Sequence, residues 1–334
     1  MADWLDCSRY RIAPVKRAYW MALLVIGILL AAVVFAPVPG DTRWIRTLHN
    51  SAHAPIFGCV SLLTLFVVRG QPRLAAVGVA GQYALALAAA VILGILTELL
   101  QIPSGRDASL EDALHDVIGA VALLGIFAAF DSRVRVSAHS GAVRLAAATI
   151  GIVALVVAVA PVTRAAMKYQ QRDARFPVLA DFTERYDRYF ILQQWAEFTP
   201  AKLPAPWASQ AGEAAMHVEL LDGAYPGLDF IELRPDWSGY STLAVDLTNP
   251  TSLALQLVLR VHDAAHNDEP ADRFSRRFEL SPRTRQIIRI PLQDVAAGPS
   301  TRELDLRNVA GMIIYRTSNS PRASELYFSR AWLE

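Results

Sequence analysis

Five apolar segments constrain the fold of residues 1–163 more than any other feature of the sequence. Crossing a bilayer takes roughly 20 apolar residues. Uncharged runs of about that length occupy 18–40, 47–68, 74–97 and 145–163. A fifth run, 117–130, is shorter but extends backwards to a helical start near Ser109. Core helices of soluble proteins rarely occur as five such runs, so this half predicts an all-α polytopic membrane domain of about five transmembrane helices.

The first of these runs has a second interpretation. It is preceded by four basic residues, as in a cleaved signal peptide; these are Arg9, Arg11, Lys16 and Arg17. Pro37 directly after Ala36 makes a poor cleavage site, and four more apolar runs follow. These features favour an uncleaved first helix.

Basic residues in the short loops predict the orientation, because such residues accumulate on the cytoplasmic side. A cytoplasmic N-terminus places nine of them inside and leaves three outside, which are Arg43, Arg46 and Arg106. Three lysines beside 29 arginines, together with abundant alanine, indicate a GC-rich bacterial genome. We therefore expect a multi-pass protein of the bacterial inner (cytoplasmic) membrane with its C-terminal half in the periplasm or its equivalent.

Charge is distributed unequally along the chain. Residues up to Thr163 include 12 Lys/Arg and 9 Asp/Glu, whereas those from Arg164 onward include 20 and 22. The second half is therefore expected in water. A net charge of +1 without a basic stripe argues against nucleic-acid binding. Cys7 and Cys59 are too few for a disulfide-stapled fold.

The second half has the pattern of β-structure. Apolar residues alternate strictly in 252–263, where Leu253, Leu255, Leu257, Leu259 and Val261 would face a core. Similar segments at 242–247, 287–292, 312–315 and 326–332 are separated by turn residues such as Asn249-Pro250 and Gly298-Pro299. The spacing predicts an all-β, jelly-roll-like sandwich over 178–334, joined to the membrane domain 1–163 by a helical neck at 164–177.

Ionisable and polar residues gather at the predicted outer face of the membrane domain, where lipid makes them costly. They come from the start of the second span, the end of the third, the connector after it and the start of the fourth. We take them as a candidate binding cluster of His53, Glu98, Gln101, Arg106, Asp112 and Asp116.

Structural explanations exist for some of these residues. Asp112 fits a helix cap that begins at Ser109, and acidic groups suit a helix N-terminus. If the second span begins near Ser51, then His53 is in its first turn and could be an interfacial histidine bonded to a neighbour. Glu98 opposes the dipole at a helix end. It therefore needs a partner, for which Arg106 and His53 are the candidates.

The pattern resembles the signature of VanZ-like membrane proteins over roughly residues 40–130. It is carried by His53 with Phe57, Glu98-Leu-Leu-Gln101, Pro103-Ser-Gly-Arg106 and Asp112 through Asp116 to Gly119. Two positions depart from the family: Asp116 replaces an Asn, and His49-Asn50 replaces an Asp-Lys pair. The resemblance implies a cell-envelope role. The family's named member is linked with low-level teicoplanin resistance, without an established reaction.

The second half resembles jelly-roll domains of the galactose-binding and carbohydrate-binding-module kind, through Trp237-Ser-Gly-Tyr240 and the closing Leu326–Leu333 among other segments. The resemblance implies sugar stacking, for which the candidate residues are Trp207, Trp237 and Tyr240; the alternative is that Trp237 and Tyr240 pack beneath a loop. His262, Asp263, His266 and Asp268 surround a polar turn, which favours a solvated hairpin over a metal cluster. We expect no metal and no cofactor.

These observations leave three functional hypotheses. In the preferred one, the cluster binds a polar headgroup of a membrane lipid or lipid-linked glycan, and the sandwich contacts carbohydrate or an envelope protein. In the second, the cluster is an acid/base site acting on a lipid-linked precursor, although no nucleophile, metal set or phosphate loop identifies a reaction. In the third, the helices anchor a domain that binds carbohydrate or a partner protein.

Overall fold

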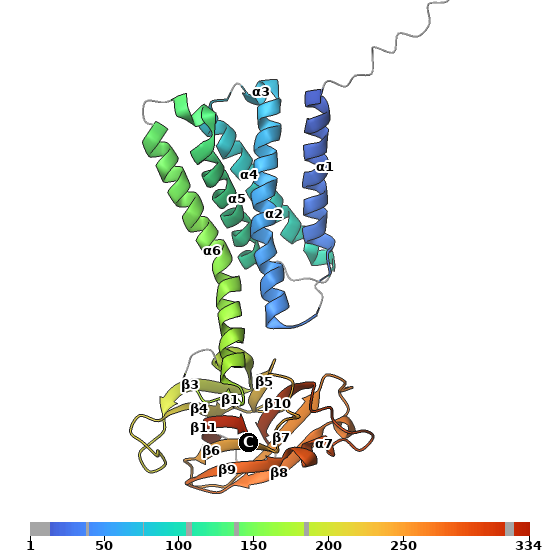
Figure 1. The fold of residues 1–334 in the computed structure, drawn as a ribbon, viewed down its shortest axis with the longest axis vertical. Coiled ribbons are helices and arrows are strands. Elements are labelled where there is room, and N and C mark those ends of the chain that lie inside the picture. Colours follow the sequence, from blue (N-terminus) through green and yellow to red (C-terminus); the bar gives the residue numbers. More distant parts are fainter. Residues whose placement is uncertain are drawn as a thin grey trace, which may run out of the picture. The chain divides into compact units, whose positions relative to one another are not determined.

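The computed structural model describes residues 14–37, 40–75, 77–104, 109–136, 140–183, 187–317 and 324–334. The chain divides into two compact units, the first ending at Ala166 and the second beginning at Met167. Figure 1 shows that the first is built of helices and the second of strands. Each unit is described by itself.

The helical unit contains long helices with short connections between them. They are α1 (Pro14–Phe35), α2 (Arg43–Gly70), the single turn α3 (Pro72–Ala75), α4 (Val79–Gln101), α5 (Leu110–Phe130) and α6 (Ser140–Arg175). Among the described residues, five helices are long and apolar enough to span a membrane. The predicted all-α half with five candidate spans is confirmed.

Capping side chains fix where two of the helices begin. Thr42 caps α2, its side chain accepting a hydrogen bond from the Ile45 amide at 3.2 Å. Ser109 caps α5 in the same way, accepting from the Asp112 amide at 3.2 Å. The expected start of the second span near Ser51 is therefore wrong, and His53 lies in the third turn of α2.

Successive long helices run in opposite directions, so their ends alternate between the two faces of the helical unit (Figure 1). The first turns of α2 and α5 consequently lie at the same end as the last turn of α4. Buried Phe57, Ala90, Ala120 and Val33, contributed by four different helices, form a small apolar core inside the unit. This packing holds the polar residues of the three helix ends close together.

The last candidate span, α6, continues through most of the predicted neck at 164–177 and ends at Arg175. Its final turns belong to the second unit. There the Tyr169 hydroxyl bonds the Glu232 carboxylate, and Arg172 donates to the Glu232 carbonyl at 2.5 Å. The helical character predicted for the neck is present up to Arg175.

The second unit is a sandwich of two antiparallel sheets. One has the order β3-β4-β11-β6-β9, with β1 also paired to β11, and the other has the order β2-β5-β10-β7-β8. The first sheet consists of β1 (Val178–Ala180), β3 (Ala196–Lys202), β4 (Ala214–Leu220), β6 (Thr242–Asn249), β9 (Thr284–Pro291) and β11 (Ser324–Leu333). The second consists of β2 (Ile191–Gln194), β5 (Gly227–Ile231), β7 (Leu255–Asp263), β8 (Phe274–Leu280) and β10 (Val309–Arg316). The predicted all-β sandwich is confirmed.

Alternating side chains from both sheets fill the space between them. Leu255, Leu257, Leu259 and Val261 of β7 are all buried, as the strict alternation predicts. The Phe230 and Phe328 rings meet across the two sheets with their centroids 5.3 Å apart. Leu253 is 55% exposed because β7 begins only at Leu255, so its predicted place in the core is wrong.

Candidate functional site

Glycines bring the helices that carry the predicted cluster into close contact. A Cβ atom on Gly119 of α5 would lie 1.9 Å from the Ala54 carbonyl oxygen of α2, and one on Gly94 of α4 would lie 2.7 Å from Asp116 Oδ2. His53 directly precedes Ala54, and Asp116 lies about one turn before Gly119. The close helix approach therefore places these two polar side chains together inside the bundle.

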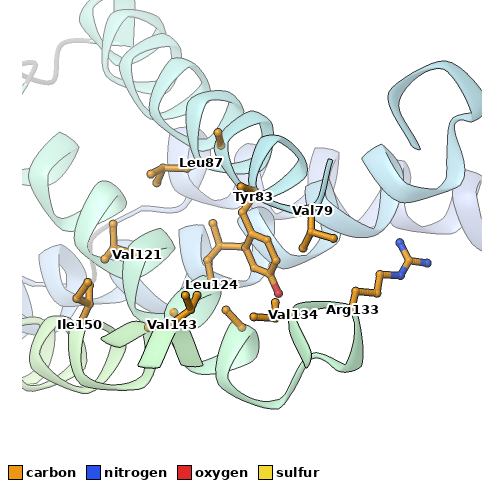
Figure 2. Close-up of a pocket in the computed structure, with 14 residues that line it drawn as sticks. Val79, Tyr83, Leu87, Val121, Leu124, Arg133, Val134, Val143 and Ile150 are labelled. Carbon is orange, nitrogen blue, oxygen red and sulfur yellow. The ribbon is translucent and has the colours of Figure 1, made fainter. Parts of the chain in front are cut away.

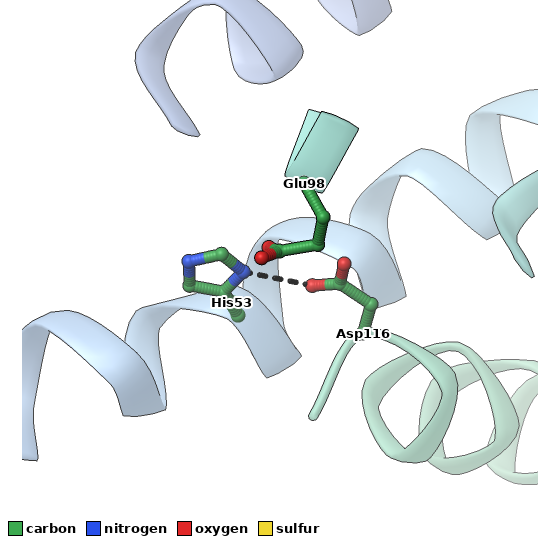
Figure 3. Close-up of side chains that lie close together, drawn as sticks. All are labelled: His53, Glu98 and Asp116. Atoms are coloured by element: carbon green, nitrogen blue, oxygen red, sulfur yellow. Dashed lines mark hydrogen bonds and ion pairs between the residues drawn. The ribbon is translucent and has the colours of Figure 1, made fainter. Parts of the chain in front are cut away.

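Three of the six predicted residues converge into one buried group. His53, Glu98 and Asp116 are 2%, 5% and 0% exposed, and each offers a ligand atom within 4.8 Å of the other two. His53 Nδ1 lies 3.0 Å from Asp116 Oδ1. Figure 3 shows both carboxylates turned toward the imidazole from different helices. We call these three side chains the His–Glu–Asp centre.

Hydrogen bonding inside this centre is incomplete. Glu98 Oε2 accepts the Ser109 amide proton at 2.7 Å, but Glu98 Oε1 and Asp116 Oδ2 have no partner among the described residues. Asp112 Oδ1, one turn before Asp116, is also buried without one. Buried carboxylate oxygens without partners are costly. The centre therefore has buried carboxylate oxygens that can accept further hydrogen bonds.

The other predicted members of the cluster have different positions. The Gln101 amide is buried and donates to the Val33 carbonyl at 3.2 Å, which ties the end of α4 to α1. Asp112 occupies the capped first turn of α5, as its structural explanation predicted. Arg106 lies outside the described residues. His49 contacts His53 edge-on, with ring centroids 6.0 Å apart.

A second polar group, at the opposite end of the helical unit, was not singled out from the sequence. Arg69 pairs with Asp131, and Tyr83 donates to the same carboxylate at 2.8 Å. Arg69 Nε also donates to Gln82 at 3.2 Å. The sequence signal for this group was Asp131, an acidic residue directly after the apolar run 117–130. The group ties together the ends of α2, α4 and α5.

A groove opens between α4, α5 and α6 near this second group. Backbone contact at Gly125 and Gly151 brings α5 and α6 together. A hollow of about 810 Å³ borders this contact and is lined mainly by apolar side chains. Figure 2 shows the Tyr83 ring among its lining residues.

The three aromatic residues predicted to stack on sugars differ in exposure. Trp237 is fully buried and its indole N–H donates to the Arg234 carbonyl at 2.9 Å, so its predicted stacking role is wrong: the ring is part of the core. Tyr240 is half-buried and meets Phe176 edge-on at 5.3 Å. Trp207 is also half-buried, and its indole N–H bonds the Arg283 carbonyl at 3.1 Å.

A different face of the sandwich combines tyrosines with polar groups. On the outer side of the sheet β2-β5-β10-β7-β8, a hollow of about 160 Å³ is lined by Gln194, Tyr225, Arg260, Ile313 and Tyr315. The two tyrosine rings meet edge-on at 5.1 Å, and Tyr225 is 54% exposed. We call these five side chains the tyrosine face.

Strand register places a carboxylate beside the tyrosine face. Asp229 of β5 and Arg260 of β7 are both paired with Ile313 of β10, so the three lie in one row. Burial raises the pKa of Asp229, opposed by the Gln194 amide and the Arg260 charge. Arg260 Nε has no partner among the described residues. The sequence did not indicate this face because its residues are distant from one another in the chain.

The polar turn after β7 forms an ion-pair network in place of the predicted solvated hairpin. Arg302 donates two bonds to Asp263 at 2.5 and 2.7 Å and also pairs with Asp272. Hydrogen bonds from Arg302 hold the pKa of Asp263 below its usual value and lower the pKa of Asp272 to about 2. His266 contacts Asp272, and Asp268 is exposed. Asp263 and Asp272 are both buried. Through Arg302 the network holds the two sides of this turn together.

Comparisons with known proteins find likenesses only to solved structures. No protein-family model and no curated protein matches the chain. The sandwich is similar to a family 11 carbohydrate-binding module from Clostridium thermocellum in complex with a mixed-linked tetrasaccharide, with 16% identity, a TM-score of 0.35, and coverage of 47% of this chain and 93% of that one. A xylan-binding domain from Paenibacillus barcinonensis has 11% identity, a TM-score of 0.32, and coverage of 47% and 94%.

A third likeness is to an exo-β-agarase, with 17% identity and a TM-score of 0.38, covering 47% of this chain and only 24% of the agarase. These values are low. The strand order of the two sheets is the basis on which the second unit is described as a jelly-roll-like sandwich.

Proposed function

We propose that this chain is a membrane protein whose sandwich binds carbohydrate on the tyrosine face. One observation carries the proposal: the hollow on the outer side of one sheet combines the exposed Tyr225 ring and the half-buried Tyr315 ring with the Arg260 guanidinium, whose Nε has no partner among the described residues. Tyrosine supplies a flat apolar surface with a polar tip, which suits a sugar ring and its hydroxyls. Gln194, Asp229 and Arg260 supply donors and acceptors around that surface.

A binding assay with the full chain in detergent micelles tests this proposal. Soluble mixed-linked β-glucan, xylan and agarose oligosaccharides serve as probes in isothermal titration. We expect Tyr315→Ala to weaken the binding of any recognised glycan at least tenfold, about 1.4 kcal/mol. Tyr327→Ala is the matched control, because Tyr327 lies on β11 of the other sheet. Equal loss in both variants, or no binding to any probe, would contradict the proposal.

For the helical unit we infer a VanZ-like role, in which the His–Glu–Asp centre holds the polar headgroup of a membrane lipid or lipid-linked glycan. The two unpartnered carboxylate oxygens support this, since they would accept hydrogen bonds from hydroxyl or amide groups. A link to glycopeptide resistance or to the handling of envelope polysaccharide would follow from such a role. The sandwich would then bind the glycan part of the same envelope polymer.

The acid/base hypothesis uses the same side chains. His53 and Asp116 form a hydrogen-bonded pair, and Glu98 is a second carboxylate beside them. Turnover of a polyprenyl-diphosphate-linked sugar by the purified chain, abolished by Glu98→Gln, would favour an enzyme. Binding of the same probe without turnover would favour a headgroup site. Glu111→Gln, at an exposed position in the first turn of α5, is the control.

A further inference from the structure

We propose that the His–Glu–Asp centre binds one divalent transition-metal ion, with Zn²⁺ as the ion that its donors fit. His53 contributes an imidazole nitrogen, and Glu98 and Asp116 contribute carboxylate oxygens. One nitrogen and two carboxylate oxygens are a donor set that Zn²⁺ accepts in proteins. The inference uses the side chains of the proposed headgroup site and is independent of glycan binding by the sandwich.

The distances suit coordination. Two ligands at about 2.1 Å from one ion lie roughly 3 to 3.5 Å apart at tetrahedral or similar angles. His53 Nδ1 and Asp116 Oδ1 are already 3.0 Å apart, and all three donor atoms lie within 4.8 Å of one another. We expect an adjustment of the Glu98 side chain to bring its carboxylate into coordination range.

The charge of the centre also requires compensation. Two carboxylates are buried with one imidazole, and among the described residues no lysine or arginine forms an ion pair with Glu98 or Asp116. Buried charges in proteins are paired or coordinate metals. A divalent cation between Glu98 and Asp116 would neutralise both carboxylates, each of which has one buried oxygen without a partner among the described residues.

The surroundings resemble the supporting shell of a metal site. The Ser109 amide donates to Glu98 Oε2 at 2.7 Å, which orients that carboxylate and leaves Oε1 free. Gly94 leaves space beside Asp116 Oδ2 that a Cβ atom would fill, at 2.7 Å. Three protein ligands leave a further position on Zn²⁺ for water or an anionic headgroup oxygen. The centre is thus built as an open site.

Metal binding by the full chain tests the inference. Protein purified in detergent without a polyhistidine tag is stripped with EDTA, incubated with Zn²⁺ or Co²⁺, desalted and analysed for metal content. We expect one ion per chain, and visible d–d absorption from Co²⁺ in a nitrogen–oxygen environment. Glu98→Gln and Asp116→Asn should each weaken Zn²⁺ binding at least tenfold, whereas Glu111→Gln should bind like wild type.

A readout on the wild-type protein guards against variants that fail to fold. A ligand that binds only the folded state raises the unfolding midpoint. Zn²⁺ should therefore raise the midpoint relative to EDTA. Absence of a bound ion together with an unchanged midpoint would overturn the inference and leave a proton-sharing network that ties the helices. Zn²⁺ binding unaffected by both Glu98→Gln and Asp116→Asn would overturn it equally.

Binding of a short-chain polyprenyl phosphate separates the two proposals for this centre. It is measured with the metal-stripped protein and with the Zn²⁺-loaded protein. Binding of this probe by a sample that retains no ion after incubation with Zn²⁺ would overturn the metal inference alone. An ion bound at the centre without any effect of the probe would overturn the headgroup proposal alone.

Discussion

Gly119 of α5 packs directly on the carbonyl oxygen of Ala54 in α2, so closely that a Cβ atom at Gly119 would lie 1.9 Å from that oxygen. A second glycine, Gly58 of α2, lies one turn further along, where a Cβ atom would be 3.0 Å from the Gly119 carbonyl oxygen. Small residues let helix backbones approach closely in membranes. This contact sets the depth at which His53 and Asp116 meet, because each is within one turn of it.

Gly119→Ala should destabilise the helical unit by about 1–3 kcal/mol, because overpacking at a backbone contact forces the two helices apart. It should also disturb the His53–Asp116 pair. Thermal unfolding in detergent measures the first effect. Gly27→Ala in α1 is the control, since a Cβ atom there meets nothing within 4 Å. Equal unfolding midpoints for both variants would show that the close approach does not hold the helices.

Asp131→Asn should destabilise the opposite end of the helical unit by about 3 kcal/mol, because it leaves a largely buried Arg69 without its carboxylate. The Arg69 and Asp131 side chains are 13% and 5% exposed. Asp41→Asn removes the carboxylate of an exposed pair with Arg46 and should cost less than about 1 kcal/mol. Thermal unfolding of the two variants side by side makes the comparison, and a larger loss for Asp41→Asn would refute it.

The sandwich should lose stability on acidification from about pH 6.5 to pH 4 because of His262. Burial lowers the pKa of His262 to about 4, helped by the neighbouring Arg260, His266 and Arg273. An unfolded histidine titrates near 6.5, so the unfolded state binds more protons in this window and unfolding is favoured as the pH falls. The loss should be smaller than the roughly 3 kcal/mol that the full difference in pKa would give, because His262 is partly exposed to solvent.

Urea unfolding followed by tryptophan fluorescence at several pH values measures this dependence. His262→Gln should flatten the curve between pH 6.5 and 4. A separate loss below pH 4 should remain in this variant, because the lowered pKa of Asp272 makes its contribution disappear as the pH falls toward about 2. A wild-type curve that is flat down to pH 4 would contradict the assignment to His262.

The predicted orientation is tested with a membrane-impermeant maleimide on intact spheroplasts. The exposed Gly212 in the sandwich and Arg73 in α3 offer positions for cysteine substitution. We expect Gly212→Cys to be labelled and Arg73→Cys to be labelled only after lysis. Cys7 and Cys59 are replaced by serine in both variants. The reverse pattern would place the sandwich in the cytoplasm.

Local sequence patterns were sufficient to predict the long helices and the core strands. Uncharged runs predicted the long helices, and alternation over Leu255–Val261 predicted a core strand, because the period of apolar residues depends only on local backbone geometry. Alternation of the helix ends was also enough to place His53, Glu98 and Asp116 at one end of the helical unit. The start of α2 was missed because Thr42 caps a polar first turn that belongs to no apolar run.

Which polar residues actually touch was decided only by the tertiary structure. Gln101 was grouped with Glu98 from their spacing, yet its amide bonds Val33 on another helix. Trp237 was a candidate for stacking on a sugar because of its aromatic ring, but it is fully buried. The tyrosine face depends on pairing β10 with both β5 and β7, which brings Tyr315 beside Tyr225 across 90 residues of chain. Helix and strand periods are local properties of the chain, whereas burial and partner choice arise from packing between distant segments, and only the folded chain specifies those.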